Sequence, residues 1–354
     1  RDFSPLQSIS HLNFQIKLKH SNVVYNYMPE GEKFYASFNF KQLVVNALLI
    51  NKLKNSQFKF QINSLQFRDP LPILSMENYE ELEYIASDSN SKVCKIRRKA
   101  DGRILISKEL CYGKMTEKEK QQIVSEVNIL RELRHPNIVK YQDRIIDKAN
   151  QRIYIIMEYC EGGDMATYLK KLKRDKEFLP EETVWKIFMQ LVFALSEIHR
   201  RKEGKILHRD IKPANVFLDS QNNVKLGGFG LSKQLPDDST FANTQISTAY
   251  YQSPEQLTDN LYNEKSDIWS AGCFLYELCT FSPPYEASSP MALALKIKSG
   301  KFERIPSRYS DELQRVITWI LTRRHEERPN VDDLVNIPWI SKKLREKRLT
   351  ENRA

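Results

Sequence analysis

The densest group of side chains able to do chemistry lies at residues 208–215, which read His-Arg-Asp-Ile-Lys-Pro-Ala-Asn. This segment carries a carboxylate at Asp210, an amine at Lys212 and a side-chain amide at Asn215. A carboxylate can accept a proton, an ammonium group can offset negative charge, and carboxylate and amide oxygens bind hard cations such as Mg2+. The fixed spacing H-R-D-x-K-P-x-N indicates a defined chemical role for the segment.

This spacing resembles the catalytic loop of protein kinases. The resemblance implies that Asp210 accepts the proton of a substrate hydroxyl, that Lys212 lies beside the transferred phosphate, and that Asn215 holds a magnesium ion. The pair Lys212-Pro213 is typical of the serine/threonine class and disfavours a tyrosine kinase. The catalytic residues implied by the resemblance are therefore Asp210, Lys212 and Asn215.

The order of further motifs along the chain agrees with this resemblance. Lys108, at the end of the third strand, would contact the α- and β-phosphates of ATP and pair with Glu126 on the next helix. Residues 156–160 would form the hinge whose backbone groups bind adenine, and Glu255 would pair with Arg328 in the interior. The nucleotide-binding residues implied in this way are Val93, Lys108, Glu126, Glu158, Cys160 and Phe217.

Longer stretches resemble the NIMA-related (NEK) serine/threonine kinases in particular. They include residues 133–139 (Leu-Arg-His-Pro-Asn-Ile-Val), residues 157–164 (Met-Glu-Tyr-Cys-Glu-Gly-Gly-Asp) and residues 262–270 (Tyr-Asn-Glu-Lys-Ser-Asp-Ile-Trp-Ser). The resemblance covers residues 79–339 and leaves out residues 1–77. It implies a cytoplasmic, cytoskeletal location in cilia or axonemes or at centrosomes, with tubulin or a microtubule-associated protein as partner.

Two departures from the kinase pattern affect the nucleotide site. The D-F-G motif is here Gly-Phe-Gly at residues 228–230, so the carboxylate that would bind Mg2+ is absent. The glycine-rich loop becomes Ala-Ser-Asp-Ser-Asn-Ser at residues 86–91, which removes the glycines that let backbone amides approach phosphates. Losing the metal would cost about 4 kcal/mol, or roughly a thousandfold in rate. We therefore expect a cleft that can bind ATP, a doubtful Mg2+ site and impaired catalysis.

Two functions are compatible with this pattern. The one we favour is a pseudokinase that acts as a binding or scaffold component of cytoskeletal structures. The alternative is an active ATP-dependent serine/threonine kinase with an atypical metal site, in which Asp219 or Glu109 supplies the missing carboxylate. The resemblance places an activating phosphorylation at Thr244, with Thr248 in the same activation segment; in a pseudokinase we expect Thr244 to be dispensable.

The composition limits the class of protein. The 354 residues, 41% hydrophobic and 28% charged, fit a globular protein and exclude a mostly disordered one. The longest apolar stretch, Leu43 to Ile50, is too short to cross a bilayer. Five scattered cysteines argue against a disulfide framework or a zinc site, and each is expected to be a small buried residue. The chain begins with Arg1 rather than Met, so we expect further sequence before it.

The net charge of +10 is concentrated at the two ends of the chain. Residues 1–77 carry +4 and residues 342–354 carry +4, which leaves +2 for the remainder. Basic ends predict contacts with an acidic partner surface, although they can also be ordinary solvated faces. No motif for reading bases accompanies the high isoelectric point, so no nucleic-acid partner is expected, and no membrane partner either.

Hydrophobic periodicity predicts the elements that position these residues. The apolar patterns divide the chain into a small α+β module (residues 1–77), a β-rich lobe (78–159), a helical lobe (160–340) and a basic helical tail (341–354), so the fold class is α+β. The resemblance implies that the two lobes are the N-lobe and C-lobe of a two-lobed protein-kinase fold, to which the first module is added. Strands are expected at residues 12–18, 23–27, 34–40, 58–62, 83–85, 93–97, 104–109, 138–147 and 152–158. Helices are expected at 42–53, 117–133, 181–201 and 313–321, with another beginning at 267. The resemblance also implies a hydrophobic spine through both lobes, formed by Leu130, Tyr141, His208 and Phe229.

Overall fold

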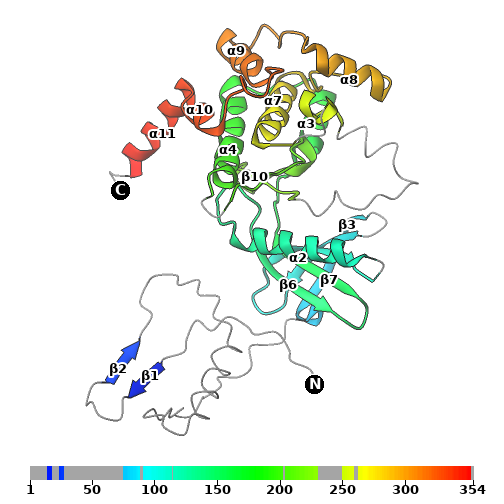
Figure 1. Cartoon of the computed structure of the whole chain (residues 1–354), viewed down its shortest axis with the longest axis vertical. Coiled ribbons are helices and arrows are strands. Elements are labelled where there is room, and N and C mark those ends of the chain that lie inside the picture. Colours follow the sequence, from blue (N-terminus) through cyan, green and yellow to red (C-terminus); the bar gives the residue numbers. More distant parts are fainter. Residues whose placement is uncertain are drawn as a thin grey trace. The chain divides into compact units, whose positions relative to one another are not determined.

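The chain divides into two compact units, Arg1–Ile73 and Leu74–Ala354 (Figure 1). The computed structural model describes residues 14–17, 24–27, 75–87, 91–113, 115–201, 204–229, 249–258 and 262–351. In the first unit, strand β1 (Phe14–Lys17) pairs antiparallel with β2 (Val24–Tyr27). Both strands were predicted, but their pairing was not. The strands expected at 34–40 and 58–62 and the helix expected at 42–53 lie outside the described residues.

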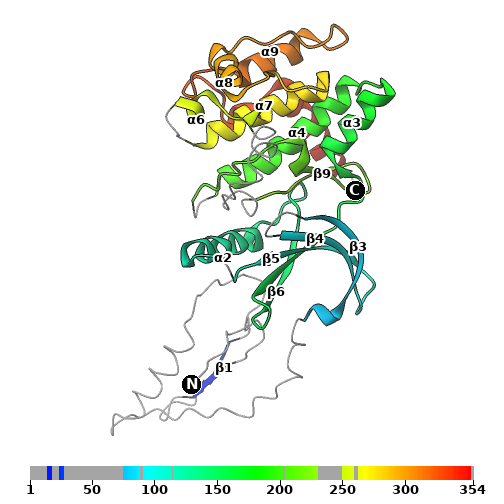
Figure 2. The ribbon, with the colours of Figure 1, turned by 90° about the vertical axis from the view of Figure 1, so that its right-hand side faces the viewer.

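The second unit begins with an antiparallel five-stranded sheet of order β3-β4-β5-β7-β6 (Figure 2). Helix α2 (Glu117–Glu132) follows β5 and begins at a capping box in which Thr116 and Glu119 bond to each other's backbone amides. These elements lie close to the predicted ranges. The short helix and strands of this lobe are η1 (Met76–Asn78), β3 (Tyr79–Ser87), β4 (Ser91–Arg98), β5 (Ile104–Cys111), β6 (Tyr141–Asp147) and β7 (Arg152–Glu158).

Strand alternation gives this sheet two apolar faces. Leu105 and Ile156 are buried on one face together with Ile96. On the other face, Ile155 packs with Val127 of α2. Since residues directly opposite each other in a ladder share a face, Lys108, which lies opposite Ile155, is on the face that α2 covers. Lys108 lies three residues before the end of β5, and not at its end as predicted.

A helical lobe with a small sheet, β8-β9-β10, follows the hinge. Its central helix α7 is buried along nearly its whole length, and the large core around it includes Leu130 and Ile138 from the first lobe. The elements of this lobe are β8 (Gly163–Asp164), α3 (Met165–Asp175), α4 (Glu181–His199), η2 (Pro213–Asn215), β9 (Val216–Leu218), β10 (Val224–Leu226), α6 (Pro254–Thr258), α7 (Glu264–Thr280), α8 (Pro290–Ser299), α9 (Asp311–Ile320), α10 (Val331–Val335) and α11 (Pro338–Glu351).

Two sequence expectations need correction in this lobe. Helix α7 begins at Glu264 and not at Asp267, because the Asn263 side chain caps it by accepting from the amides of Lys265 and Ser266. All five cysteines are free thiols as expected, but Cys111 is exposed whereas the other four are buried. Each helix within the described ranges is too short or too polar to span a lipid bilayer.

Candidate active site

One buried carboxylate on α7, that of Asp267, holds the loop at residues 208–215 in place. Asp267 accepts the backbone N–H groups of His208 at 2.9 Å and Arg209 at 3.0 Å, and it also binds His199 Nε2 at 2.8 Å. Tyr262 donates its hydroxyl to the same carboxylate. Burial alone would raise the pKa of Asp267, but the hydrogen bonds and the nearby histidines outweigh it and lower the pKa. Asp267 therefore fixes the backbone of the loop at His208 and Arg209.

His208 connects this loop to the segment that contains Gly228. Its Nε2 lies 2.8 Å from the Gly227 carbonyl oxygen, and its Nδ1 lies 3.3 Å from the Asp210 amide nitrogen. Burial lowers the pKa of His208, so the neutral ring donates from Nε2 and accepts at Nδ1. The ring also packs edge-on against Phe229, with centroids 4.7 Å apart.

The predicted hydrophobic spine is present in the described residues as a packed group. Phe229 is only 8% exposed and belongs to the same apolar cluster as Leu130, against which Tyr141 also packs. Together with the contact between His208 and Phe229, this packing joins the two lobes. These contacts form the spine that the resemblance implied.

The three predicted catalytic residues lie together. Lys212 Nζ is 3.1 Å from Asp210 Oδ2. Asn215 Nδ2 donates to the same oxygen at 2.9 Å and to the Asp210 carbonyl oxygen at 2.7 Å. Both protons of the Asn215 amide are thus bound to Asp210, which leaves only Oδ1 of this side chain as a ligand for a metal.

The side chain of Asn215 takes up the space that a carboxylate at residue 228 would need. Gly228 has a φ of +74°, which lies in the left-handed region that L-residues rarely adopt. A Cβ placed at Gly228 would lie 2.5 Å from Asn215 Oδ1 and 2.7 Å from Asn215 Nδ2. A side chain at residue 228 would therefore collide with Asn215 unless Asn215 moved. The described residues also contain no group of three His, Cys, Asp or Glu side chains that could hold a metal.

The two carboxylates considered as substitutes have other contacts. Asp219 accepts the backbone N–H groups of Gln221 at 2.9 Å and Asn223 at 2.8 Å, and so caps the turn between β9 and β10. Partial burial raises the pKa of Asp219, but these bonds outweigh it and lower the pKa. Glu109 pairs with Arg152 at 2.8 Å, and it follows Lys108 on β5 and therefore faces the other side of the sheet.

The predicted nucleotide-binding residues come from both lobes. Val93 lies opposite Lys108 in the β4–β5 ladder, so both are on the same face of the sheet. Phe217 on β9 packs close to Gly227, since a Cβ at Gly227 would lie 2.9 Å from its ring. The side chain of Glu126 and residues Thr244 and Thr248 lie outside the described residues, as does residue 88 of the altered glycine-rich loop.

The side chains of the hinge are used for structural contacts. The Glu158 carboxylate pairs with Lys225 at 3.0 Å and accepts the Lys140 amide at 3.0 Å, which ties the hinge to β10. Cys160 is buried, and burial raises the pKa of its thiol to about 12. The carbonyl of Cys160 accepts from the Gly163 amide at 3.1 Å. Any role of Glu158 and Cys160 in binding adenine would therefore use their backbone groups.

The interior ion pair predicted from the sequence is confirmed. Arg328 contacts both oxygens of Glu255, at 2.8 and 3.1 Å, and both side chains are buried. Burial raises the pKa of Glu255, but Arg328 outweighs this effect and lowers it. The pair fixes the end of the activation segment against the helical lobe.

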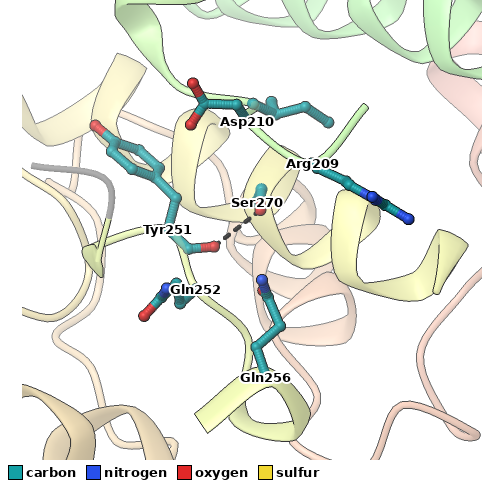
Figure 3. A pocket seen from close by; sticks show the side chains of 7 residues that line it. Arg209, Asp210, Tyr251, Gln252, Gln256 and Ser270 are labelled. Carbon is teal, nitrogen blue, oxygen red and sulfur yellow. Dashed lines mark hydrogen bonds between the residues drawn. The ribbon is translucent and has the colours of Figure 1, made fainter. Parts of the chain in front are cut away.

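A small open pocket of about 10 Å³ beside Asp210 was not predicted (Figure 3). Ser270 donates to the Tyr251 carbonyl oxygen at 2.8 Å across its floor, and the Gln256 side chain accepts from the Ser253 amide at 2.8 Å. The only sequence signal was the Ser-Pro-Glu motif at residues 253–255, which these residues flank. The pocket is lined by Arg209, Asp210, Ile211, Tyr251, Gln252, Gln256 and Ser270.

Comparison with known proteins agrees with this architecture. A model of the protein kinase domain matches residues 79–340. The serine/threonine-protein kinase Nek2 of Homo sapiens is 55% identical over 267 residues, which are 75% of this chain and 60% of that protein. The probable serine/threonine-protein kinase nek2 of Dictyostelium discoideum is 50% identical over 274 residues, 77% of this chain and 65% of that protein.

A more distant similarity is to the G2-specific protein kinase nimA of Emericella nidulans, 42% identical over 300 residues, which span 78% of this chain and 43% of that protein. The chain thus spans less than two thirds of the length of these relatives. The two-lobed fold predicted from the sequence is confirmed by the matched domain and by the sheet and helical lobes.

Proposed function

Because this chain belongs to the NIMA-related family of serine/threonine protein kinases, we propose that it is a pseudokinase, a kinase-like protein that binds partners without transferring phosphate efficiently. The observation that carries this proposal is the relation of Gly228 to Asn215. The D-F-G carboxylate is absent, and the amide of Asn215 fills the space beside Gly228. Protein kinases rely on that carboxylate and its metal to neutralise the developing phosphate charge.

The rest of the domain supports a binding role. Asp267, the Glu255–Arg328 pair and the packing of His208 on Phe229 hold the loops in place through protein contacts alone. A surface that is fixed before binding loses less conformational entropy when a partner docks. These contacts are useful to a scaffold whether or not the cleft carries out chemistry.

The proposed setting is a cytoplasmic, cytoskeletal structure such as a cilium or centrosome, with tubulin or a microtubule-associated protein as partner. Its support is the family resemblance together with the charge at the ends of the chain. Helix α11 carries Lys342 and Arg345 as exposed side chains, and the tail as a whole is basic. A basic helix is attracted to an acidic protein surface.

A second candidate is a working serine/threonine kinase with an atypical metal site. It is favoured by the retained geometry of Asp210 and Lys212, whose side chains are 3.1 Å apart, and by relatives that are named as kinases. In this case Asp210 would orient the substrate hydroxyl and Lys212 would offset charge on the phosphate. Protein kinase domains bind ATP, so both candidates allow ATP in the cleft.

Phosphate transfer from labelled ATP to a general protein substrate such as casein distinguishes the two candidates. The Asp210→Asn variant gives the background, since it keeps the size of the side chain but removes the base. Human Nek2 serves as the positive control. The proposal predicts that the wild-type chain does not exceed the Asp210→Asn background. Transfer that depends on Mg2+ and is abolished by Asp210→Asn would establish the working kinase.

A further inference from the structure

Helix α8 presents two large apolar side chains to solvent. Met291 is 78% exposed and Leu295 is 64% exposed, the highest values among the described large apolar residues. They are four residues apart, so they lie on the same face of the helix. Lys298 continues this face one turn further, and Lys301 follows the helix end. We call these four residues the α8 surface.

The fold of α8 does not depend on this surface. Leu293 and Ile297, on the opposite face, are buried and anchor the helix to the lobe. Ser289 caps its start by accepting the Ala292 amide, and Gly300 ends it with a φ of +67°. Because they are adjacent and both strongly exposed, Met291 and Leu295 form an apolar patch that a partner could cover.

The charged side chains of α8 itself are all cationic. No acidic residue occurs from Pro290 to Phe302. Lys298 and Lys301 are exposed, and the Arg323 guanidinium reaches the same helix end by donating to the Lys298 carbonyl oxygen at 3.3 Å. Lys296 is turned back to the Glu286 carbonyl oxygen. The apolar pair therefore borders a cluster of cations at the C-terminal end of the helix.

We infer that the α8 surface docks an acidic amphipathic helix of a partner protein. Apolar residues one turn apart on such a helix would pack against Met291 and Leu295, and its carboxylates would meet Lys298 and Lys301. Methionine is unbranched and adapts its shape to different partners. The inference holds for a pseudokinase and for a working kinase alike, because it does not involve the cleft.

The position of α8 gives this docking a consequence for the active site. Helix α6 packs against α8, and the two helices lie side by side in Figure 2. Gln256 on α6 lines the pocket beside Asp210. Helix α6 therefore connects α8 to this pocket.

The test uses the full chain and a fluorescently labelled helical peptide. Its leucines are spaced alternately three and four residues apart, so that they share one face, and its other residues are glutamates. Binding is followed by fluorescence anisotropy at rising salt. We expect Met291→Gln/Leu295→Gln to weaken binding by about tenfold or more, and Lys298→Glu/Lys301→Glu to weaken it and flatten its salt dependence. The matched control is Ile146→Gln on β6, where Ile146 is 51% exposed and binding should not change.

Four outcomes would overturn the inference. They are no measurable binding of the peptide, equal binding by the Met291→Gln/Leu295→Gln variant, equal binding of a peptide with lysine in place of each glutamate, and loss of binding in the Ile146→Gln control. Two further assays exclude other occupants. If Met291→Gln/Leu295→Gln instead loses binding to phosphatidylcholine–phosphatidylserine vesicles, the surface binds a membrane. If this variant loses self-association in sedimentation, the surface binds a second copy of the chain.

Discussion

The side-chain amide of Asn215 occupies the place where a side chain at Gly228 would begin. A Cβ at Gly228 would lie 2.5 Å from Asn215 Oδ1, and the backbone there is left-handed. Asn215 is turned toward Asp210, to which its amide donates twice. Asn215, which the resemblance places at the metal site, is thus hydrogen-bonded within the protein, next to the position that lacks the D-F-G carboxylate.

Restoring the acid by Gly228→Asp should destabilise the protein by about 1–3 kcal/mol, because the left-handed backbone and Asn215 both oppose a side chain. Gly228→Ala is the matched control, since it adds a Cβ without a carboxylate. Urea unfolding should show a smaller cost for either change in an Asn215→Ala background. Equal costs in both backgrounds would show that Asn215 does not block the position. Any gain in Mg2+ binding should appear with Gly228→Asp and not with Gly228→Ala.

Phe229→Ala should lower the free energy of unfolding by about 3–5 kcal/mol, because it removes a buried ring that packs against His208. Thermal or urea unfolding without nucleotide measures the loss. The exposed Ile146→Ala variant on β6 provides the comparison and should be close to neutral. An unchanged melting temperature for Phe229→Ala would mean that the spine is not assembled without nucleotide.

Stability should fall between pH 4.5 and 7 through Glu277, which accepts the Tyr251 hydroxyl. Burial raises the pKa of Glu277 from 4.5 to about 7, and nearby Glu286 adds to the effect. In this range the folded state keeps the proton and the unfolded state loses it. The free energy of unfolding should therefore decrease with rising pH, by up to about 1.4 kcal/mol per unit, and level off above pH 7.

Glu277→Gln removes this titration while keeping an oxygen that can accept from Tyr251. Urea unfolding of both proteins from pH 5 to 8 should show the variant gaining stability relative to the wild type as the pH rises. Parallel pH profiles would contradict a raised pKa at Glu277.

The basic ends, and not the activation segment, should carry attachment to microtubules. Co-sedimentation of the wild-type chain with microtubules should weaken as salt rises, because salt screens exposed charges. It should also be weaker after deletion of residues 1–77, or after neutralisation of Lys342, Lys343, Arg345, Lys347 and Arg348. Thr244→Ala should leave it unchanged. If Thr244→Ala releases the protein and the end variants do not, regulated signalling replaces the scaffold role.

The sequence predicted the residues whose spacing is fixed by a motif. Asp210, Lys212 and Asn215 are neighbours in the chain, and their side chains meet in the structure. Glu255 and Arg328 are far apart in sequence, yet their pairing was predicted because the resemblance specifies both positions. The strands of the first lobe and helices α2, α4 and α9 were predicted because their apolar residues keep a regular period. The strands β8, β9 and β10 and the helices α3, α8 and α10 were not predicted.

Features that depend on packing between distant segments were not predictable. The left-handed φ at Gly228 and the position of Asn215 depend on how their two loops pack together. No local sequence pattern predicts this packing. The pocket at Gln252 and Gln256 likewise requires α7 and the catalytic loop to come together. The exposure of Met291 and Leu295 could not be predicted from the sequence, because apolar residues in a helix usually indicate its buried face.

Calorimetric titration of ATP into the full chain, with MgCl2 and with EDTA, tests the pseudokinase proposal most directly. The absent carboxylate and the turned Asn215 predict an affinity for ATP that differs by less than about threefold between the two conditions. An affinity that is about tenfold or more tighter with Mg2+ would contradict the proposal and show that this cleft still assembles a metal site.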